Sequence, residues 1–168
     1  VRWIRNDVHF LTDADNNHLC VMLSARDINN SKVEEQKLKD AAKLDRMTKV
    51  FNRETAMEEI RQILRQESDK GHSLYMLDVD NFKALNDTLG HQAGDGLLIR
   101  LANKLKESVR ETDVIGRIGG DEFFIFMREV SEQNCAEHRA KQLMSVISEV
   151  AKDFLQVKVS GSIGISRY

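Results

Sequence analysis

The sequence contains no proline, only two cysteines and few aromatic residues, which make up 6% of its 168 positions. Cys20 and Cys135 stand apart, and neither has a cysteine or histidine partner at metal-ligand spacing. A disulfide framework and a cysteine-based zinc site are therefore not expected. No run approaches the roughly 20 apolar residues that cross a bilayer, and the chain does not open with a signal-peptide pattern. These absences favour a cytoplasmic protein and leave contact with a membrane only to a further upstream segment.

An excess of basic charge is also missing. The chain carries 25 Lys and Arg against 27 Asp and Glu, a formal net charge of −2 at pH 7. Nucleic-acid-binding domains usually have a basic excess, so a nucleic-acid partner is not expected. A single nucleotide is compatible with this balance, because a local pocket can be basic on a neutral protein. The length suits one domain, or one domain with a fragment of another.

The first thirty residues predict two β-strands, over residues 2–11 and 19–25, with turn-forming Asp and Asn residues between them. Two strands alone are marginal in water, so we expect residues 1–30 to be the end of an upstream domain. Residues 31–44 are rich in Lys, Glu, Gln and Ala and carry a thin apolar stripe, which predicts a linker helix. The stripe is too short to distinguish a solvated helix from one seam of a parallel coiled coil.

Residues 45–168 alternate between helical and strand patterns. Two of the strands flank the run Gly119-Gly120-Asp121-Glu122, which is typical of a tight hairpin turn. The order predicts an α+β fold, a split βαβ, ferredoxin-like sheet with flanking helices and a central hairpin. The predicted helices include residues 54–66, 94–110 and a stretch capped by Ser131, and the predicted strands are 74–77, 114–118, 123–127 and 157–165.

Three carboxylates coincide with the ends of these strands. Asp78 ends an apolar strand, and Asp121 and Glu122 lie in the hairpin turn. If the strands are neighbours, the carboxylates meet at one sheet edge, where they repel one another unless a cation neutralises them. Hard oxygen ligands suit Mg²⁺ or Mn²⁺, which can activate a hydroxyl and stabilise in-line displacement at phosphorus. Gly119 and Gly120 let the backbone approach a bulky ligand. Taken alone, an Asp-x-Asp run is more often an ordinary turn or helix cap, and a Gly-Gly-Asp run is more often an ordinary hairpin turn.

Longer motifs surround these carboxylates. In chain order they are Asp78-Val79-Asp80-Asn81-Phe82-Lys83, Asn86-Asp87, Gly90-His91, Gly94-Asp95 and Arg117-Ile118-Gly119-Gly120-Asp121-Glu122-Phe123. Over roughly residues 45–165 the chain resembles the GGDEF family of bacterial diguanylate cyclases, and the match includes the signature itself. The resemblance implies a nucleotide-cyclase-type sheet and a reaction that condenses two GTP molecules into cyclic di-GMP with release of pyrophosphate.

The resemblance also implies roles for individual residues. Asp121 or Glu122 would help to deprotonate the 3′-hydroxyl, and Lys83 would stabilise charge on the reacting phosphates. The sequence does not separate the two acids. The residues that would hold the metal are Asp78, the Val79 carbonyl, Asp121 and Glu122. Those that would bind the nucleotide are Asn86 and Asp95 on the guanine edge, with His91, Phe82, Gly119 and Gly120 around it.

The family reaction needs two domains that face each other, each holding one GTP, so the resemblance implies a homodimer. The linker helix would then set how the two catalytic domains meet. Arg110 and Asp113 resemble the family's Arg-x-x-Asp product-inhibition site, in which an Arg fork and an Asp would grip cyclic di-GMP.

Two departures from the family pattern stand out. Lys49 occupies a turn position where the family has glycine, so strained backbone is expected there. The chain stops at Tyr168, whereas family members continue with a helix whose Lys and Arg residues contact the triphosphate. We therefore expect residues 45–168 to lack the C-terminal part of the domain and to bind GTP poorly. Upstream, residues 2–31 resemble the closing strands of a PAS sensor domain, which implies a signal input.

Two alternatives to an enzyme stay open. The domain could be an inactive receptor for GTP or cyclic di-GMP, or a dimerising relay that binds no nucleotide. The presence of Asp78, Asn86, Asp95, Asp121 and Glu122 favours the enzyme, because a receptor has no need of both signature carboxylates.

Overall fold

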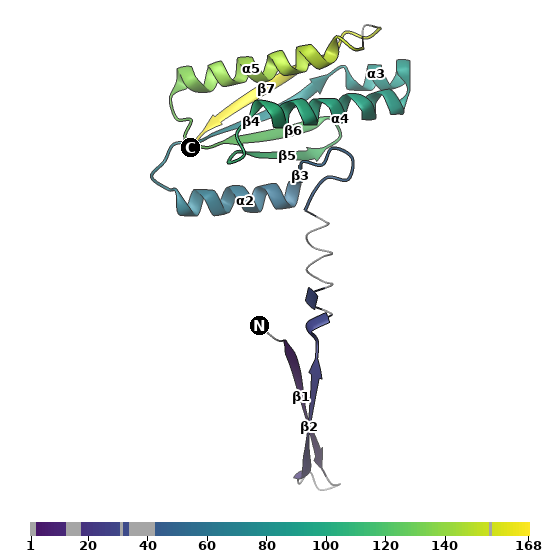
Figure 1. Ribbon diagram of the computed structural model, residues 1–168, viewed down its shortest axis with the longest axis vertical. Coiled ribbons are helices and arrows are strands. Elements are labelled where there is room, and N and C mark those ends of the chain that lie inside the picture. The colour runs from purple at the N-terminus through teal and green to yellow at the C-terminus, as the bar shows by residue number, and fades with distance from the viewer. Residues whose placement is uncertain (1–2, 13–17, 31, 34–42, 155) are drawn as a thin grey trace. The chain divides into compact units, whose positions relative to one another are not determined.

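Figure 1 presents a computed structural model of the chain, which describes residues 3–12, 18–30, 32–33, 43–154 and 156–168. The chain divides into two units, residues 1–42 and 43–168. In the first unit, strands β1 (Ile4–Thr12) and β2 (His18–Asp27) pair antiparallel, as the two β-rich runs predicted. The predicted turn between them and most of the predicted linker helix fall outside the described residues.

The apolar side chains described in this hairpin are exposed to solvent. Trp3 is 54% exposed, Val8 50% and Leu23 74%. A two-stranded ribbon has too little surface to bury its own apolar groups. The hairpin therefore gains little stability from the side chains that the structure describes.

The second unit is built on one mixed sheet. Its strands lie in the order β3-β5-β6-β4-β7, and every neighbouring pair is antiparallel except β3 with β5. The predicted ferredoxin-like α+β plan is confirmed, because β6 inserts antiparallel between β4 and β5 to give the split βαβ arrangement. The strands are β3 (Phe51–Asn52), β4 (Ser73–Asp80), β5 (Val114–Gly119), β6 (Glu122–Met127) and β7 (Ser160–Arg167).

Helices cover both faces of this sheet, with α2 on one side and α3, α4 and α5 on the other (Figure 1). Strand β6 explains the arrangement, because its side chains alternate between two apolar clusters. Phe123 and Ile125 pack toward α4 and α5, and Phe124 and Phe126 pack toward α2. The helices are α2 (Arg53–Gln66), α3 (Phe82–Leu89), α4 (His91–Ser108) and α5 (Gln133–Ala151).

Three local details differ from the sequence prediction. The prediction that Ser131 caps the helix is wrong, because Glu132 is the N-cap of α5, and its side chain makes no cap hydrogen bond. The last strand begins at Ser160 rather than residue 157, since the chain before it is held in turns by bonds such as Val157 N–H to Phe154 C=O (3.1 Å). Strand β4 continues through Asp80, so Asp78 lies within a strand and not after one.

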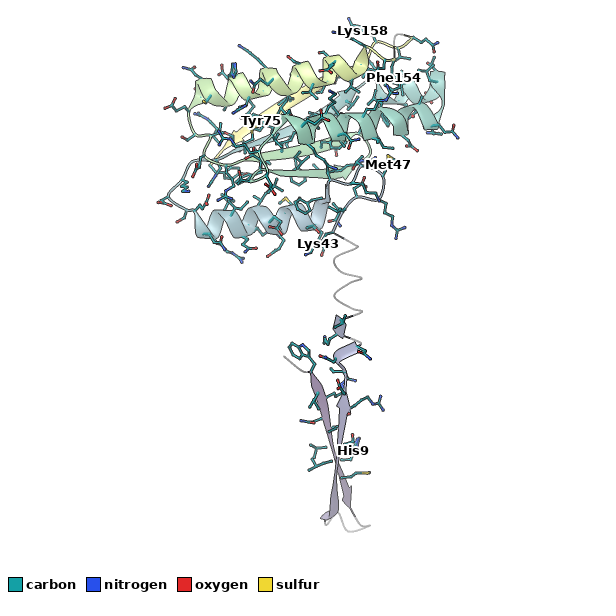
Figure 2. The ribbon with its side chains drawn as sticks, viewed as in Figure 1. His9, Lys43, Met47, Tyr75, Phe154 and Lys158 are labelled. Carbon is teal, nitrogen blue, oxygen red and sulfur yellow. The ribbon has the colours of Figure 1, made fainter. Side chains whose placement is uncertain are left out.

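Buried hydrogen bonds fix β4 against the helices. The ring of Tyr75, labelled in Figure 2, is fully buried, and its hydroxyl donates to the Ala136 carbonyl of α5 over 3.2 Å. A buried hydroxyl without a partner would destabilise the fold. Because Tyr75 must keep this partner, the bond holds β4 at a fixed position against α5. Within the described part of the chain, none of the helices is long and apolar enough to cross a membrane.

Candidate functional site

The predicted carboxylates meet at one edge of the sheet. Asp78 on β4 is paired directly with Glu122, the first residue of β6. Asp121 precedes Glu122 in the hairpin turn. Burial raises the pKa of Asp78, and the negative charges of Asp121, Glu122 and Asp80 raise it further, in that order. The repulsion expected from the sequence is therefore present.

The described part of the chain offers no ion-paired cation to balance this acidic edge. Among the described residues, no Lys or Arg forms an ion pair with Asp78, Asp121 or Glu122, and no group of three His, Cys, Asp or Glu side chains is close enough to enclose a metal. Mg²⁺ is commonly held by one or two carboxylates and completed by substrate phosphates, rather than by an all-protein cage. The oxygen donors at this edge fit a hard divalent cation of that kind.

An arginine holds the signature turn in place. Gly120 adopts a left-handed conformation (φ 55°), which glycine accepts without steric cost. The Arg117 guanidinium donates to the Gly120 carbonyl through Nε (3.0 Å) and Nη2 (2.6 Å) and through Nη1 to Asp45 Oδ1 (3.1 Å). No role was predicted for Arg117 or Asp45, although Arg117 begins the signature run Arg117-Ile118-Gly119-Gly120-Asp121-Glu122-Phe123.

Four of the residues predicted to bind the nucleotide, Phe82, Asn86, His91 and Asp95, lie where α3 meets α4, while Gly119 and Gly120 lie in the β5–β6 turn. Gly94 is buried, and a Cβ added there would strike the Asn86 side chain and approach the Phe82 ring (3.1 Å to Cζ). Asn86 and Phe82 therefore lie against the first turns of α4, beside the exposed Asp95. Gly94 was not predicted as a site residue, but the close approach of Asn86 explains why a glycine stands there.

Two predicted residues surround this cluster. Lys83 is exposed on the first turn of α3, and His91 is the exposed first residue of α4. The helices are separated at Gly90, whose φ of 85° is in the region that favours glycine. The short break lets both helices present polar side chains at the same end of the fold.

The predicted product-inhibition residues lie at the other end of β5. Asp113 accepts the backbone N–H of Arg110 (3.0 Å) and of Arg128 (3.1 Å), one on each carboxylate oxygen. Asp113 thus fixes the turn before β5 and ties it to the end of β6. The Arg110 side chain is exposed.

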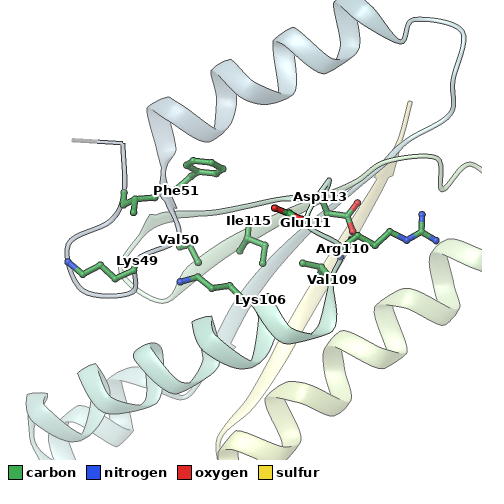
Figure 3. Close-up of a pocket in the computed structure, with 10 residues that line it drawn as sticks. Lys49, Val50, Phe51, Lys106, Val109, Arg110, Glu111, Asp113 and Ile115 are labelled. Carbon is green, nitrogen blue, oxygen red and sulfur yellow. Dashed lines mark hydrogen bonds between the residues drawn. The ribbon is translucent and has the colours of Figure 1, made fainter. Parts of the chain in front are cut away.

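Two hollows flank this turn. One, of about 170 Å³, is lined by three arginines, Arg110, Arg128 and Arg139, with Asp113 nearby. Arg128 and Arg139 were missed because they are far from Arg110 in sequence and only the fold brings them together. The other, of about 350 Å³, has an apolar wall that includes Val50 and Ile115, and the Arg110 side chain extends away from it (Figure 3).

Comparisons with known proteins agree with this architecture. The family model described as "Diguanylate cyclase, GGDEF domain" matches residues 42–168. The chain is 37% identical over 127 residues to the bifunctional diguanylate cyclase/cyclic di-GMP phosphodiesterase MucR of Pseudomonas aeruginosa, covering 74% of this chain and 18% of that protein. It is 31% identical over 149 residues to the probable diguanylate cyclase DgcE of Escherichia coli, covering 85% and 13%. The chain thus spans less than a fifth of these relatives.

A solved structure shares the fold. It is a microbial GGDEF domain described with bis-(3′,5′)-cyclic di-GMP, with a TM-score of 0.64 and 31% identity over 77% of this chain and 79% of that one. The family match covers the whole sheet and the helices that carry the acidic edge, the α3–α4 cluster and the Arg110 turn. The chain therefore belongs to the GGDEF family of diguanylate cyclase domains.

Proposed function

We propose that this domain is catalytically active and condenses two GTP molecules into cyclic di-GMP, with release of two pyrophosphates. The observation that carries the proposal is the unbalanced acidic edge of Asp78, Asp121 and Glu122. A fold gains nothing from placing like charges together, so their retention points to a ligand that supplies positive charge. A receptor that only holds nucleotide does not require all three.

The same edge has the donors for the chemistry. The Asp78 carboxylate, the Val79 carbonyl and the Asp121 and Glu122 carboxylates would hold Mg²⁺ or Mn²⁺, which when bound supplies the charge that activates a 3′-hydroxyl. Asp121 or Glu122 would accept the proton of the 3′-hydroxyl as the hydroxyl oxygen attacks the α-phosphate of the opposing GTP. Lys83 would balance negative charge on the phosphates. The bond between the α- and β-phosphates of that GTP breaks and pyrophosphate leaves; the same step in the opposite direction closes the ring and releases the second pyrophosphate.

The α3–α4 cluster would bind the guanine base. Guanine presents a carbonyl acceptor and N–H donors on one edge, which match an amide and a carboxylate. Asn86, packed against Gly94, and the exposed Asp95 offer these groups at the same helix junction. Phe82 and His91 would line the pocket around the base, with Gly119 and Gly120 leaving room beside the phosphates.

We further propose that two copies face each other, because each condensation joins two bound nucleotides. Cyclic di-GMP would then occupy the arginine-lined hollow beside Arg110 and restrain the domain. The exposed apolar side chains of the β1–β2 hairpin support an upstream domain that covers them, and we propose a PAS-type sensor in that place. A reaction that consumes GTP suits a cytoplasmic location.

The test measures cyclic di-GMP by liquid chromatography after the natural full-length protein is incubated with GTP and Mg²⁺. The Asp121→Asn variant removes one acid of the edge, and Glu137→Gln, on the outside of α5, is the matched control. We expect product from the wild type and the control, and a loss of at least about a hundredfold in Asp121→Asn. GTP or cyclic di-GMP binding without any product would instead leave a nucleotide receptor, and absence of both would leave a relay domain.

A further inference from the structure

Strand β7 contributes no residue to the proposed reaction, yet it borders β4 along the acidic edge (Figure 1). Asp80, the last residue of β4, is paired with Ser160 at the start of β7, and Asp78 with Ser162. The Ser160 hydroxyl donates to Asp80 Oδ2 and the Ser162 hydroxyl to Asp80 Oδ1, each over 2.9 Å. Two hydroxyls of one strand thus hold both oxygens of a single carboxylate.

These bonds distinguish two acids that look equivalent in the sequence. In the run Asp78-Val79-Asp80, both carboxylates project from the same face of β4, because side chains alternate along a strand. Asp80 has both oxygens engaged, whereas Asp78 has no hydrogen-bond donor among the described residues. Asp78 is therefore available to a ligand, and Asp80 is committed to the protein.

The next residue is tied to the same segment. Asn81 adopts a left-handed conformation (φ 63°, ψ 19°), which Asn tolerates better than most residues. Its side-chain amide donates to the Lys158 carbonyl, just before β7, over 2.9 Å. Its own carbonyl accepts the Leu85 N–H (3.0 Å) and begins α3. The turn between β4 and α3 is thus joined at two consecutive residues, Asp80 to β7 and Asn81 to the segment just before it.

We propose that Asp80 and Asn81, held by Ser160, Ser162 and the Lys158 carbonyl, form a positioning clamp for the β4–α3 turn. The clamp fixes the Val79 carbonyl beside Asp78 and sets where α3 begins. Since α3 carries Lys83 and Asn86, β7 positions both the metal-binding and the nucleotide-binding groups without touching either ligand. The importance of the clamp for the reaction rests on the proposed function, while the clamp itself rests on the three hydrogen bonds to Ser160, Ser162 and the Lys158 carbonyl.

The test removes the two hydroxyls together, in the natural full-length protein, with the double variant Ser160→Ala/Ser162→Ala. Ser166→Ala is the matched control, because it lies on the same face of β7 and has no side-chain hydrogen bond among the described residues. Hydrogen–deuterium exchange of peptides covering residues 79–86 is measured without nucleotide. We expect exchange about tenfold faster in the double variant and unchanged in the control.

The second readout is the affinity for a fluorescent GTP analogue with Mg²⁺. We expect the Kd to rise about tenfold in the double variant, and to recover in Ser160→Thr/Ser162→Thr, which restores both hydroxyls. Wild-type exchange over residues 79–86 in the double alanine variant would overturn the clamp. Weak binding in Asp80→Asn beside wild-type binding in the double alanine variant would also overturn it, because Asp80 would then act on the ligand directly.

The two proposals fail separately. If the wild type binds no GTP and makes no product, the proposed function falls. The exchange measurement on the nucleotide-free protein still decides whether the clamp exists.

Discussion

The two ends of the β5–β6 hairpin differ in how their charges are balanced. At the signature end, Asp78, Asp121 and Glu122 lie together with no ion pair among the described residues. At the opposite end, Glu67 is bonded to Arg128, which holds the pKa of Glu67 below its ordinary value, and Lys70 pairs with Glu129 over 2.5 Å.

This contrast separates two uses of charge. Paired charges at one end join the segment after α2 to the end of β6, so they contribute to the stability of the fold. Unpaired like charges at the other end oppose folding and become favourable only when a cation arrives. A stable fold can tolerate such an edge because its core is large and lies elsewhere, between the sheet and its helices.

The largest expected effect comes from comparing the loss of an unpaired carboxylate with the loss of a paired one. Asp78→Asn removes a repelled carboxylate, so we expect cyclic di-GMP formation to fall at least about a hundredfold while Tm stays level or rises. Glu67→Gln breaks a pairing at the opposite end, so we expect Tm to fall by a few degrees while activity stays within about twofold. Product formation and thermal denaturation are measured on both variants. Equal losses of stability in the two would break the contrast.

A smaller effect concerns the pH dependence of the Asp45–Arg117 link. Burial alone would raise the pKa of Asp45, but hydrogen bonds from Thr48 and Arg117 outweigh it and hold the pKa below its ordinary value. A depressed carboxyl pKa stabilises the fold above the unfolded value, about 3.9, and this stability is lost as pH falls through the folded pKa. We expect wild type to exceed Asp45→Asn in Tm at pH 7 and the gap to close below about pH 4.

Thermal denaturation at pH 7, 5, 4 and 3 checks this. Asp69→Asn is the matched control, since that exposed carboxylate has no hydrogen bond among the described residues. A gap that stayed constant from pH 7 to pH 3 would show that the carboxylate charge of Asp45 does not stabilise the turn.

The smallest effect is expected at Lys49, away from both groups of charges. Its φ of 56° confirms the strained turn predicted from the sequence. Glycine removes the left-handed strain, and this gain exceeds the loss from the greater freedom of the unfolded chain. We therefore expect Lys49→Gly to stabilise the fold by about 0.5–1 kcal/mol. Urea denaturation measures the gain, with unchanged cyclase activity. Lys49→Ala keeps a Cβ and should show no such gain; an equal gain there would assign the effect to the lost charge.

The sequence predicted the fold well where a pattern is local. The continuous apolar run of residues 123–127 and the helical spacing of residues 94–110 sufficed to place β6 and α4. The two-residue strand β3 was missed, because Phe51 and Asn52 form a strand only through pairing with Gly116 and Arg117. Such pairing is decided by tertiary contacts and leaves no periodic signal.

The candidate site divides in the same way. The meeting of Asp78 with Glu122 was predicted on the condition that their strands are neighbours, and the pairing of β4 with β6 fulfils that condition. The different hydrogen bonding of Asp78 and Asp80 could not be predicted, because it depends on two hydroxyls of β7 that lie 80 and 82 positions after Asp80 in the chain. The arginines around Arg110 likewise become neighbours only once β6 and α5 are placed.

Gly161 of β7 is paired with Val79 of β4 and faces Ile147 of α5. A methyl group there would press on Ile147 Cδ1 of α5 (2.5 Å) and on the backbone carbonyl of Asp78 (3.2 Å). Because Gly161 has no side chain, the apolar interior at Ile147 can pack closely against the strand that carries the acidic edge. A larger residue at position 161 would therefore force α5 and the acidic strand β4 apart.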